Sequence, residues 1–244
     1  MTGLAKLPRG RVKPLDDIAR LRSEYEDRKR RFARSDLYSW SNTANLFGIQ
    51  GRQRAVLIAL KRHGFTDLSN LKVLEMGCGG GGVLAEFLAF GVSSCNLYGV
   101  DLLGDRLTHA HRWLPGSGFA NADGQHLPFP SHTFDLVMQY TALSSVLDEG
   151  IRRNICADML RAVKPGGLIL SYDFWLNPTN PQTRGVRPAE IRRLFPHCHY
   201  EFRRITLAPP ITRKLVSISW GLCLFLESLK IFNTHYLAVI SKIP

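Results

Sequence analysis

The stretch "KVLEMGCGGGGVLAEFL", residues 72–88, constrains the fold more than any other part of the chain. A short apolar strand pattern runs directly into a cluster of glycines, and a helix-forming segment follows at once. Gly77, Gly79 and Gly82 fit the G-x-G-x-x-G spacing of turns that bind nucleotide cofactors. Glycine lets the backbone approach a ligand closely, and the next helix presents free N–H groups. The alternative is a tight strand–helix turn that binds nothing.

Strand and helix patterns alternate along the chain after this turn, which predicts βαβ units and a parallel sheet. Near the C-terminus the rhythm changes, and two late strands could close the sheet as an antiparallel pair. The predicted strands cover 72–76, 96–101, 117–121, 134–140, 167–174, 200–208 and 235–242, and the predicted helices cover 82–90, 103–113, 149–163, 189–195 and 211–230. We therefore expect the α/β class, with a single Rossmann-like, seven-stranded, mostly parallel sheet, an antiparallel terminal strand pair and an N-terminal helical cap.

Three regions are expected along the chain. Residues 1–14 form a mobile basic N-terminus, 15–66 the helical cap with helices over 15–34 and 45–62, and 67–244 the cofactor-binding domain. The first helix is strongly cationic with one apolar stripe. It could be a lid over the site, a contact for an anionic membrane or nucleic acid, or a solvated face.

The charge and cysteine content limit the partners. A net charge of +12 favours an anionic partner, although a basic enzyme without one is an equal alternative. The five cysteines form no C-x-x-C pair, so we expect no metal site and no disulfide framework. The N-terminus lacks the apolar region of a secretory signal. We expect a cytoplasmic protein, with attachment at a membrane surface as an alternative.

Five segments, in this order, resemble the class I S-adenosylmethionine (SAM)-dependent methyltransferases, specifically their small-molecule group. They are "VLEMGCGGG", "YGVD", "NADGQHLPFP", "FDLVMQYTAL" and "LRAVKPGGLILSYDF". Their coincidence is specific for fold and cofactor, and carries little information about the substrate. The resemblance implies SAM as the cofactor and S-adenosyl-L-homocysteine as its product.

The resemblance implies roles for acidic residues at three strand ends. Glu75 would reach the ammonium group of SAM directly or through water, Asp101 would accept from the ribose hydroxyls, and Asp123 from the adenine amino group. The residues agree with this, since a nicotinamide dinucleotide would place a pyrophosphate beside Glu75, which would repel it. Asp101 could instead cap a helix. The other cofactor-binding residues implied are Gly77, Cys78, Gly79, Leu102, Gly124, Gln139 and, as an aromatic closing over the cofactor, Tyr38.

The acceptor side of the site is predicted from later segments. Asp173 ends the fifth strand and could act as the catalytic base, or could cap the following turn. Tyr140, the last residue of the predicted fourth strand, is a candidate to contact the acceptor. The turn-rich loop 177–188 either forms an acceptor pocket or only connects elements. In the first case Asn177, Asn180 and Arg184 are candidates to hydrogen-bond a polyhydroxylated or anionic acceptor.

The predicted helix 211–230 carries a second apolar stripe. Leu215, Ile218, Leu222, Phe225 and Leu229 recur at helical spacing. We expect this stripe to pack against the sheet.

The expected function is SAM-dependent methyl transfer to a small-molecule acceptor, at an oxygen of a sugar-containing or secondary-metabolite substrate. One alternative is an RNA methyltransferase, favoured by the charge of +12. However, "MQYTAL" lacks the Asn/Asp-Pro-Pro-Tyr of amino-directed nucleic-acid enzymes of this fold, so nucleic acid is the weaker choice. The others are a methyltransferase for a membrane-associated lipid acceptor, anchored by the first helix and by 211–230, and a non-catalytic scaffold. Either a monomer or a homodimer fits the sequence.

Overall fold

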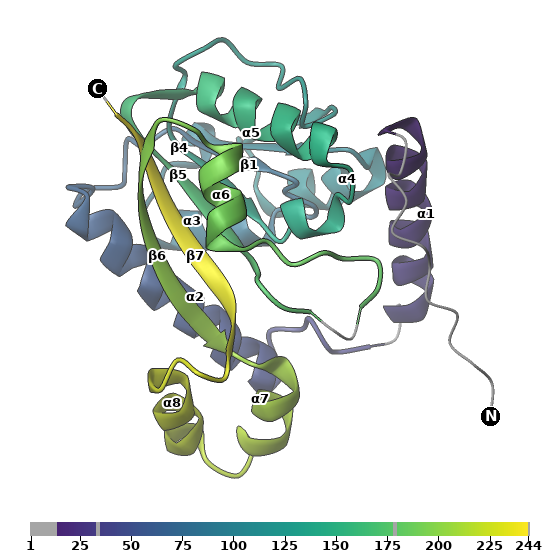
Figure 1. Ribbon diagram of the computed structural model, residues 1–244, viewed down its shortest axis with the longest axis vertical. Coiled ribbons are helices and arrows are strands. Elements are labelled where there is room, and N and C mark those ends of the chain that lie inside the picture. Colours follow the sequence, from purple (N-terminus) through teal and green to yellow (C-terminus); the bar gives the residue numbers. More distant parts are fainter. Residues whose placement is uncertain (1–13, 33–34, 178–179, 244) are drawn as a thin grey trace.

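A computed structural model of the chain describes residues 14–32, 35–177 and 180–243 (Figure 1). Its centre is a seven-stranded sheet in the order β3-β2-β1-β4-β5-β7-β6. The strands are β1 (Val73–Met76), β2 (Leu97–Asp101), β3 (Gly118–Asn121), β4 (Phe134–Tyr140), β5 (Val163–Phe174), β6 (Cys198–Leu207) and β7 (Asn233–Lys242). The first five run parallel, and β7 is antiparallel to both β5 and β6. The predicted fold class is confirmed.

Helices cover both faces of this sheet, so its central strands are apolar at nearly every position. Side chains of α2, α3 and α4 share one core with Val73, Leu136 and Leu170, and side chains of α5 and α6 share the other with Leu74 and Ile169. The helices are α1 (Pro14–Phe32), α2 (Thr43–Arg62), α3 (Gly82–Ala89), α4 (Gly104–Trp113), α5 (Glu149–Ala162), α6 (Pro188–Leu194), α7 (Pro209–Leu215) and α8 (Trp220–Ser228), with 3₁₀ turns η1 (Ser94–Asn96) and η2 (Leu143–Ser145).

The two N-terminal helices differ in position (Figure 1). The helix α2 begins after Asn42, whose side chain accepts from the N–H groups of Ala44 and Asn45, and it packs on the sheet. The helix α1 lies to one side and places Leu21 in the core that contains α5. These are the helices predicted over 45–62 and 15–34. Of the predicted mobile segment 1–14, residues 1–13 lie outside the described residues.

The prediction of a single helix over 211–230 is wrong, because this segment forms the two helices α7 and α8. Between them the chain is extended at Ser219, whose hydroxyl accepts from the N–H of Leu222 and begins a new helix. The two helices connect β6 to β7 and project beyond the sheet (Figure 1).

The predicted packing of the 211–230 stripe is also wrong. Most of the stripe is exposed, including Ile218 and Phe225. The break at Ser219 turns α8 so that Cys223 is buried instead, in a small cluster with Phe47 of α2.

Candidate functional site

The glycine loop between β1 and α3 has a conformation that requires glycine. Gly77, Gly79 and Gly81 all have positive φ angles, of 74°, 54° and 80°. A Cβ on Gly77 would lie 2.8 Å from the Cβ of Ala142, which follows β4. The N–H of Gly77 donates to Val100 O of β2 at 2.7 Å. The loop is therefore held at the carboxyl ends of three neighbouring strands, where open α/β sheets bind ligands.

Asp101, at the end of β2, fixes this loop. Its Oδ2 accepts from the N–H of Gly79 at 2.7 Å, and its Oδ1 accepts from the N–H of Leu103 at 2.9 Å. The guanidinium of Arg106 lies against Gly79, with Nη1 3.7 Å from Asp101 Oδ2. The ring of Tyr25 on α1 covers that guanidinium, 4.9 Å from its Cζ to the ring centroid.

Glu75 is the one acidic residue of β1, and its side chain is 2% exposed. Within the described chain its Oε2 is buried without a hydrogen-bond partner. Burial raises the pKa of Glu75 well above its usual value, and the nearby carboxylate of Glu86 raises it further. An unpaired buried acceptor costs free energy, so a ligand that brings a cationic donor fits this position.

A largely buried ion pair whose charges act on Glu75 was missed from the sequence. Arg52 of α2 donates through Nη2 to Glu86 Oε1 of α3, and its guanidinium lies 5.3 Å and 5.5 Å from the ring centroids of Tyr140 and Tyr172. Burial raises the pKa of Tyr140. The sequence does indicate that Arg52 faces the core, because Arg52 shares helical spacing with buried Val56 and Leu60 of α2.

The loop after β3 joins the same edge of the sheet. The N–H of Ala122 donates to Asp101 O at 3.2 Å, and Gly124 packs against the side chain of Met76 at the end of β1. Both carboxylate oxygens of Asp123 accept from Gln125, through the backbone N–H and through Nε2, each at 2.9 Å. Leu102, directly after Asp101, is half-buried. The cofactor-binding residues predicted on the first three strands and Gly124 thus gather at one edge.

Two predicted residues at the ends of β4 and β5 shape the turn η2. Gln139 Oε1 accepts from the N–H groups of Ala142 and Leu143, at 3.0 Å and 3.1 Å. Asp173 Oδ2 accepts from the N–H of Ser144 at 2.9 Å, and Oδ1 accepts from its neighbour, Phe174 N–H. Asp173 is buried, which raises its pKa to about 6.

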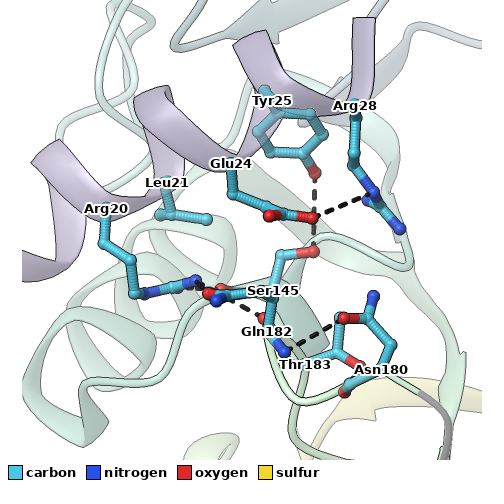
Figure 2. Close-up of a pocket in the computed structure, with 9 residues that line it drawn as sticks. All are labelled: Arg20, Leu21, Glu24, Tyr25, Arg28, Ser145, Asn180, Gln182 and Thr183. Atoms are coloured by element: carbon cyan, nitrogen blue, oxygen red, sulfur yellow. Dashed lines mark hydrogen bonds and ion pairs between the residues drawn. The ribbon is translucent and has the colours of Figure 1, made fainter. Parts of the chain in front are cut away.

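The helix α1 faces Ser145 of η2 and the segment that contains Gln182 (Figure 2). Arg20 donates to Ser145 O at 2.5 Å and to Gln182 Oε1 at 3.0 Å, while Asp17 Oδ2 accepts from the N–H groups of Leu147 and Asp148. In the last turn of α1, Lys29 forms an ion pair with Asp105 of α4 at 2.8 Å. Among the three alternatives for this helix, its contacts favour a lid.

Two of the residues predicted to bind the acceptor line a cleft of about 440 Å³ beyond the end of β5. Arg184 lines it, and forms ion pairs with Glu149 at 3.2 Å and Glu190 at 2.6 Å. Asn177 lines it too and donates to Thr183 Oγ1.

Three predicted residues lie outside this cleft. Tyr140 is buried beside Tyr172 and Arg52. Asn180 Oδ1 accepts from the N–H of Gln182, beside α1. Tyr38 is 65% exposed in the α1–α2 connection, with its ring edge against Phe32. The described part of the chain contains no group of three or more metal-ligating side chains, and no helix there is long and apolar enough to cross a membrane.

Comparisons with known proteins find methyltransferases among the similar sequences. Residues 73–167 match a family model described as a methyltransferase domain. Phthiotriol/phenolphthiotriol dimycocerosates methyltransferase 1 of Mycobacterium ulcerans is 34% identical over 116 residues, which are 47% of this chain and 41% of that protein. Sterol 24-C-methyltransferase of Aspergillus fumigatus is 29% identical over 128 residues, 48% of this chain and 32% of that protein. The chain therefore matches less than half the length of these two relatives.

Solved structures share the fold over nearly the whole chain. Burkholderia thailandensis 1,6-didemethyltoxoflavin-N1-methyltransferase, with 1,6-didemethyltoxoflavin and S-adenosylhomocysteine bound, superposes with a TM-score of 0.64 at 18% identity, and covers 97% of this chain and 92% of that one. A TehB-like SAM-dependent methyltransferase of Corynebacterium glutamicum superposes with a TM-score of 0.57 at 18% identity, and covers 95% of this chain and all of that one.

Proposed function

We propose that this chain, a member of the class I SAM-dependent methyltransferase family, transfers the methyl group of SAM to a small-molecule acceptor. The observation that carries the proposal is the set of three acidic side chains, Glu75, Asp101 and Asp123, around one glycine loop. The unpaired buried oxygen of Glu75 supports it most directly, because the ammonium group of SAM would supply the missing donor.

The residues fit the parts of SAM in order along the strand ends. Glu75 would accept from the ammonium group, Asp101 from the ribose hydroxyls and Asp123 from the adenine amino group. When bound, SAM supplies an electrophilic methyl group on a positively charged sulfur. The chain contributes by aligning the acceptor with that methyl and excluding water, a task suited to the lid α1.

An oxygen acceptor must lose a proton during the transfer, and we propose Asp173 as the group that accepts it. A pKa of about 6 leaves this carboxylate mostly ionised at neutral pH, as a general base requires. Both oxygens also accept from backbone N–H groups of Ser144 and Phe174. The alternative is that Asp173 only positions η2, and that alignment alone accounts for catalysis.

The acceptor would enter through the cleft beside Asn177 and Arg184. Its lining of amide, guanidinium and carboxylate groups suits hydroxyl-bearing molecules, which supports an oxygen of a sugar-containing or secondary-metabolite substrate. A membrane lipid is the second candidate. It is supported by the exposed apolar side chains of α8 and by the sterol named in one relative.

Calorimetric titration with S-adenosylhomocysteine tests the proposal. We expect micromolar binding to the wild type, and binding weaker by about tenfold, 1.4 kcal/mol, in Asp101→Asn. The matched control is Asp135→Asn, which changes a carboxylate that accepts from Lys72 N–H at the amino end of the sheet. NADH serves as the ligand control. A wild type that binds NADH and not S-adenosylhomocysteine would refute the cofactor assignment.

A further inference from the structure

The segment 208–232, which contains α7 and α8, concentrates exposed apolar side chains. We call it the apolar lobe. Of the fifteen large apolar side chains that are exposed among the described residues, seven lie in it. They are Ile218, Leu222, Leu224, Phe225, Leu229, Ile231 and Phe232. Ile218 is 76% exposed and Phe225 is 59% exposed. Such a concentration marks an interaction surface rather than ordinary surface composition.

The lobe is firmly attached on its inner side, so its outer side chains are not exposed by loose packing. The ring of Trp220 packs edge-on against Phe47 of α2, with centroids 5.0 Å apart. Cys223 is fully buried in the same cluster. Asn233 donates to Glu227 O at 3.0 Å, which ties the end of α8 to the start of β7.

The exposed charged side chains of the lobe are all cationic. Its basic residues, Arg213, Lys214 and Lys230, are all exposed. Its one acidic residue, Glu227, is buried and faces Arg54 of α2, 3.7 Å away. The outer surface thus combines cations with large apolar side chains and presents no carboxylate. This composition is complementary to anionic headgroups lying over acyl chains.

We propose that the apolar lobe docks the protein on an anionic lipid bilayer. Ile218, Phe225 and the neighbouring apolar side chains enter the boundary between headgroups and acyl chains, while the three cations contact lipid phosphates. Insertion of this kind needs no spanning helix.

The lobe lies at the edge of the sheet that carries the candidate site. β7 begins directly after it, and His235 of β7 pairs with Phe174, the last residue of β5. Trp175, which lines the acceptor cleft, donates through Nε1 to Asn233 O at 2.9 Å. Figure 1 shows α7 and α8 beyond the end of β6 and the start of β7, away from α4 and α5. A docked protein would therefore meet an amphiphilic acceptor close to the cleft, an extension that rests on the proposed methyl transfer.

Vesicle co-sedimentation tests the docking. The full chain is mixed with phosphatidylcholine vesicles that contain none or roughly 30% phosphatidylglycerol, which supplies the anionic surface. We expect binding to the anionic vesicles, weaker by about tenfold or more in Ile218→Ser/Phe225→Ser, since both side chains lose apolar area that would be buried. The matched control is Trp113→Ser on α4, because Trp113 is 74% exposed outside the lobe; it should bind like the wild type.

A second pair of variants tests the charges. Arg213→Gln/Lys214→Gln should bind the anionic vesicles roughly 30-fold more weakly, because each of the two cations contributes roughly 1 kcal/mol near the surface. Arg112→Gln/Arg153→Gln removes the same charge elsewhere and should have a much smaller effect.

Several outcomes would overturn the docking. The first is a wild type that does not bind anionic vesicles at low salt, and the second is a lobe variant that binds them like the wild type. The third is a dimer in light scattering that Ile218→Ser/Phe225→Ser abolishes, since the lobe would then contact a second copy. Titration of each variant with S-adenosylhomocysteine separates this result from the proposed function. A wild type that binds vesicles but not S-adenosylhomocysteine would support the docking and refute the methyl transfer.

Discussion

Replacing Glu75 by Gln tests whether this carboxylate serves a ligand or the fold. The side chain is buried at the end of β1, and one of its oxygens has no partner among the described residues. Gln keeps the shape and the acceptor oxygen but removes the charge. If Glu75 is retained for a cationic ligand, the ligand-free protein should gain stability from the substitution while ligand affinity falls.

The size of both effects follows from the burial. An unsatisfied buried polar group costs about 1–3 kcal/mol, more when charged. Relief of even ~1 kcal/mol would raise the Tm of a protein of this size by about 2–4 °C. A hydrogen bond to a charged group contributes about 1.5–3 kcal/mol, so the dissociation constant for S-adenosylhomocysteine should increase by roughly 10- to 150-fold.

The stability effect should depend on pH in a definite direction. The pKa of Glu75 is raised in the folded state, so the folded protein holds this proton more tightly than the unfolded chain does. Below the unfolded pKa, about 4.3, both states are protonated and the wild type bears no penalty. As the pH rises through the raised folded pKa, the wild type loses stability. The advantage of Glu75→Gln should therefore be small at acid pH and largest at alkaline pH, as measured by thermal unfolding without ligand.

Glu86→Gln is the matched control, because Glu86 is also buried but has a partner. Arg52 donates to its carboxylate, and the substitution would leave a buried guanidinium without its counter-charge. We expect this variant to lose roughly 3 kcal/mol of unfolding free energy. If Glu75→Gln also lowers the Tm and leaves the affinity for S-adenosylhomocysteine unchanged, Glu75 is a structural residue and the reasoning fails.

Three further predictions concern the loop, the core and the proposed base. Gly77→Ala should lower the free energy of unfolding by about 1–3 kcal/mol in urea, because its φ is 74° and a Cβ would meet another side-chain carbon at 2.8 Å; Gly82→Ala, with nothing within 4 Å, should not lower it. Arg152→Ala should cost about 3 kcal/mol or more by the same measurement, since this arginine is fully buried and paired with a glutamate at 2.7 Å. The exposed neighbour Arg153→Ala should change stability by at most about 0.5 kcal/mol. If Asp173 accepts the acceptor proton, kcat should fall below a pH of about 6, and Asp173→Asn should lower kcat and remove that limb; an unchanged profile would assign it to positioning alone.

The arrangement of Glu75, Asp101 and Asp123 could be predicted because it depends on topology alone. Each carboxylate lies within two residues of the carboxyl end of a strand, and parallel strands bring these ends to one edge whatever the details of packing. The glycines between β1 and α3 were predictable for a similar local reason, since their spacing marks a turn.

The contacts of Arg52 and the place of α1 could not be predicted in this way. Arg52 meets Glu86 only because α2 and α3 pack on the same face of the sheet, and nothing near either residue in the sequence specifies that. The stripe on α1 shows which side is buried, but its position depends on Asp17 accepting from backbone N–H groups 130 residues away. Those contacts exist only in the folded chain.

The failed prediction for 211–230 has a physical cause that also bears on function. Helical spacing of apolar residues predicts a buried face only if the helix is continuous, because one break changes the direction of every side chain that follows. Ser219 supplies that break, since its hydroxyl accepts from Leu222 N–H and satisfies the first turn of α8. The stripe that would have packed on the sheet is then divided, and Phe225 is exposed. Replacing Ser219 by Ala would remove the cap at a cost of about 1 kcal/mol without restoring a single helix, because the inner face of α8 remains fixed by Cys223 and Trp220. The exposed apolar surface is therefore determined by the whole packing of the lobe.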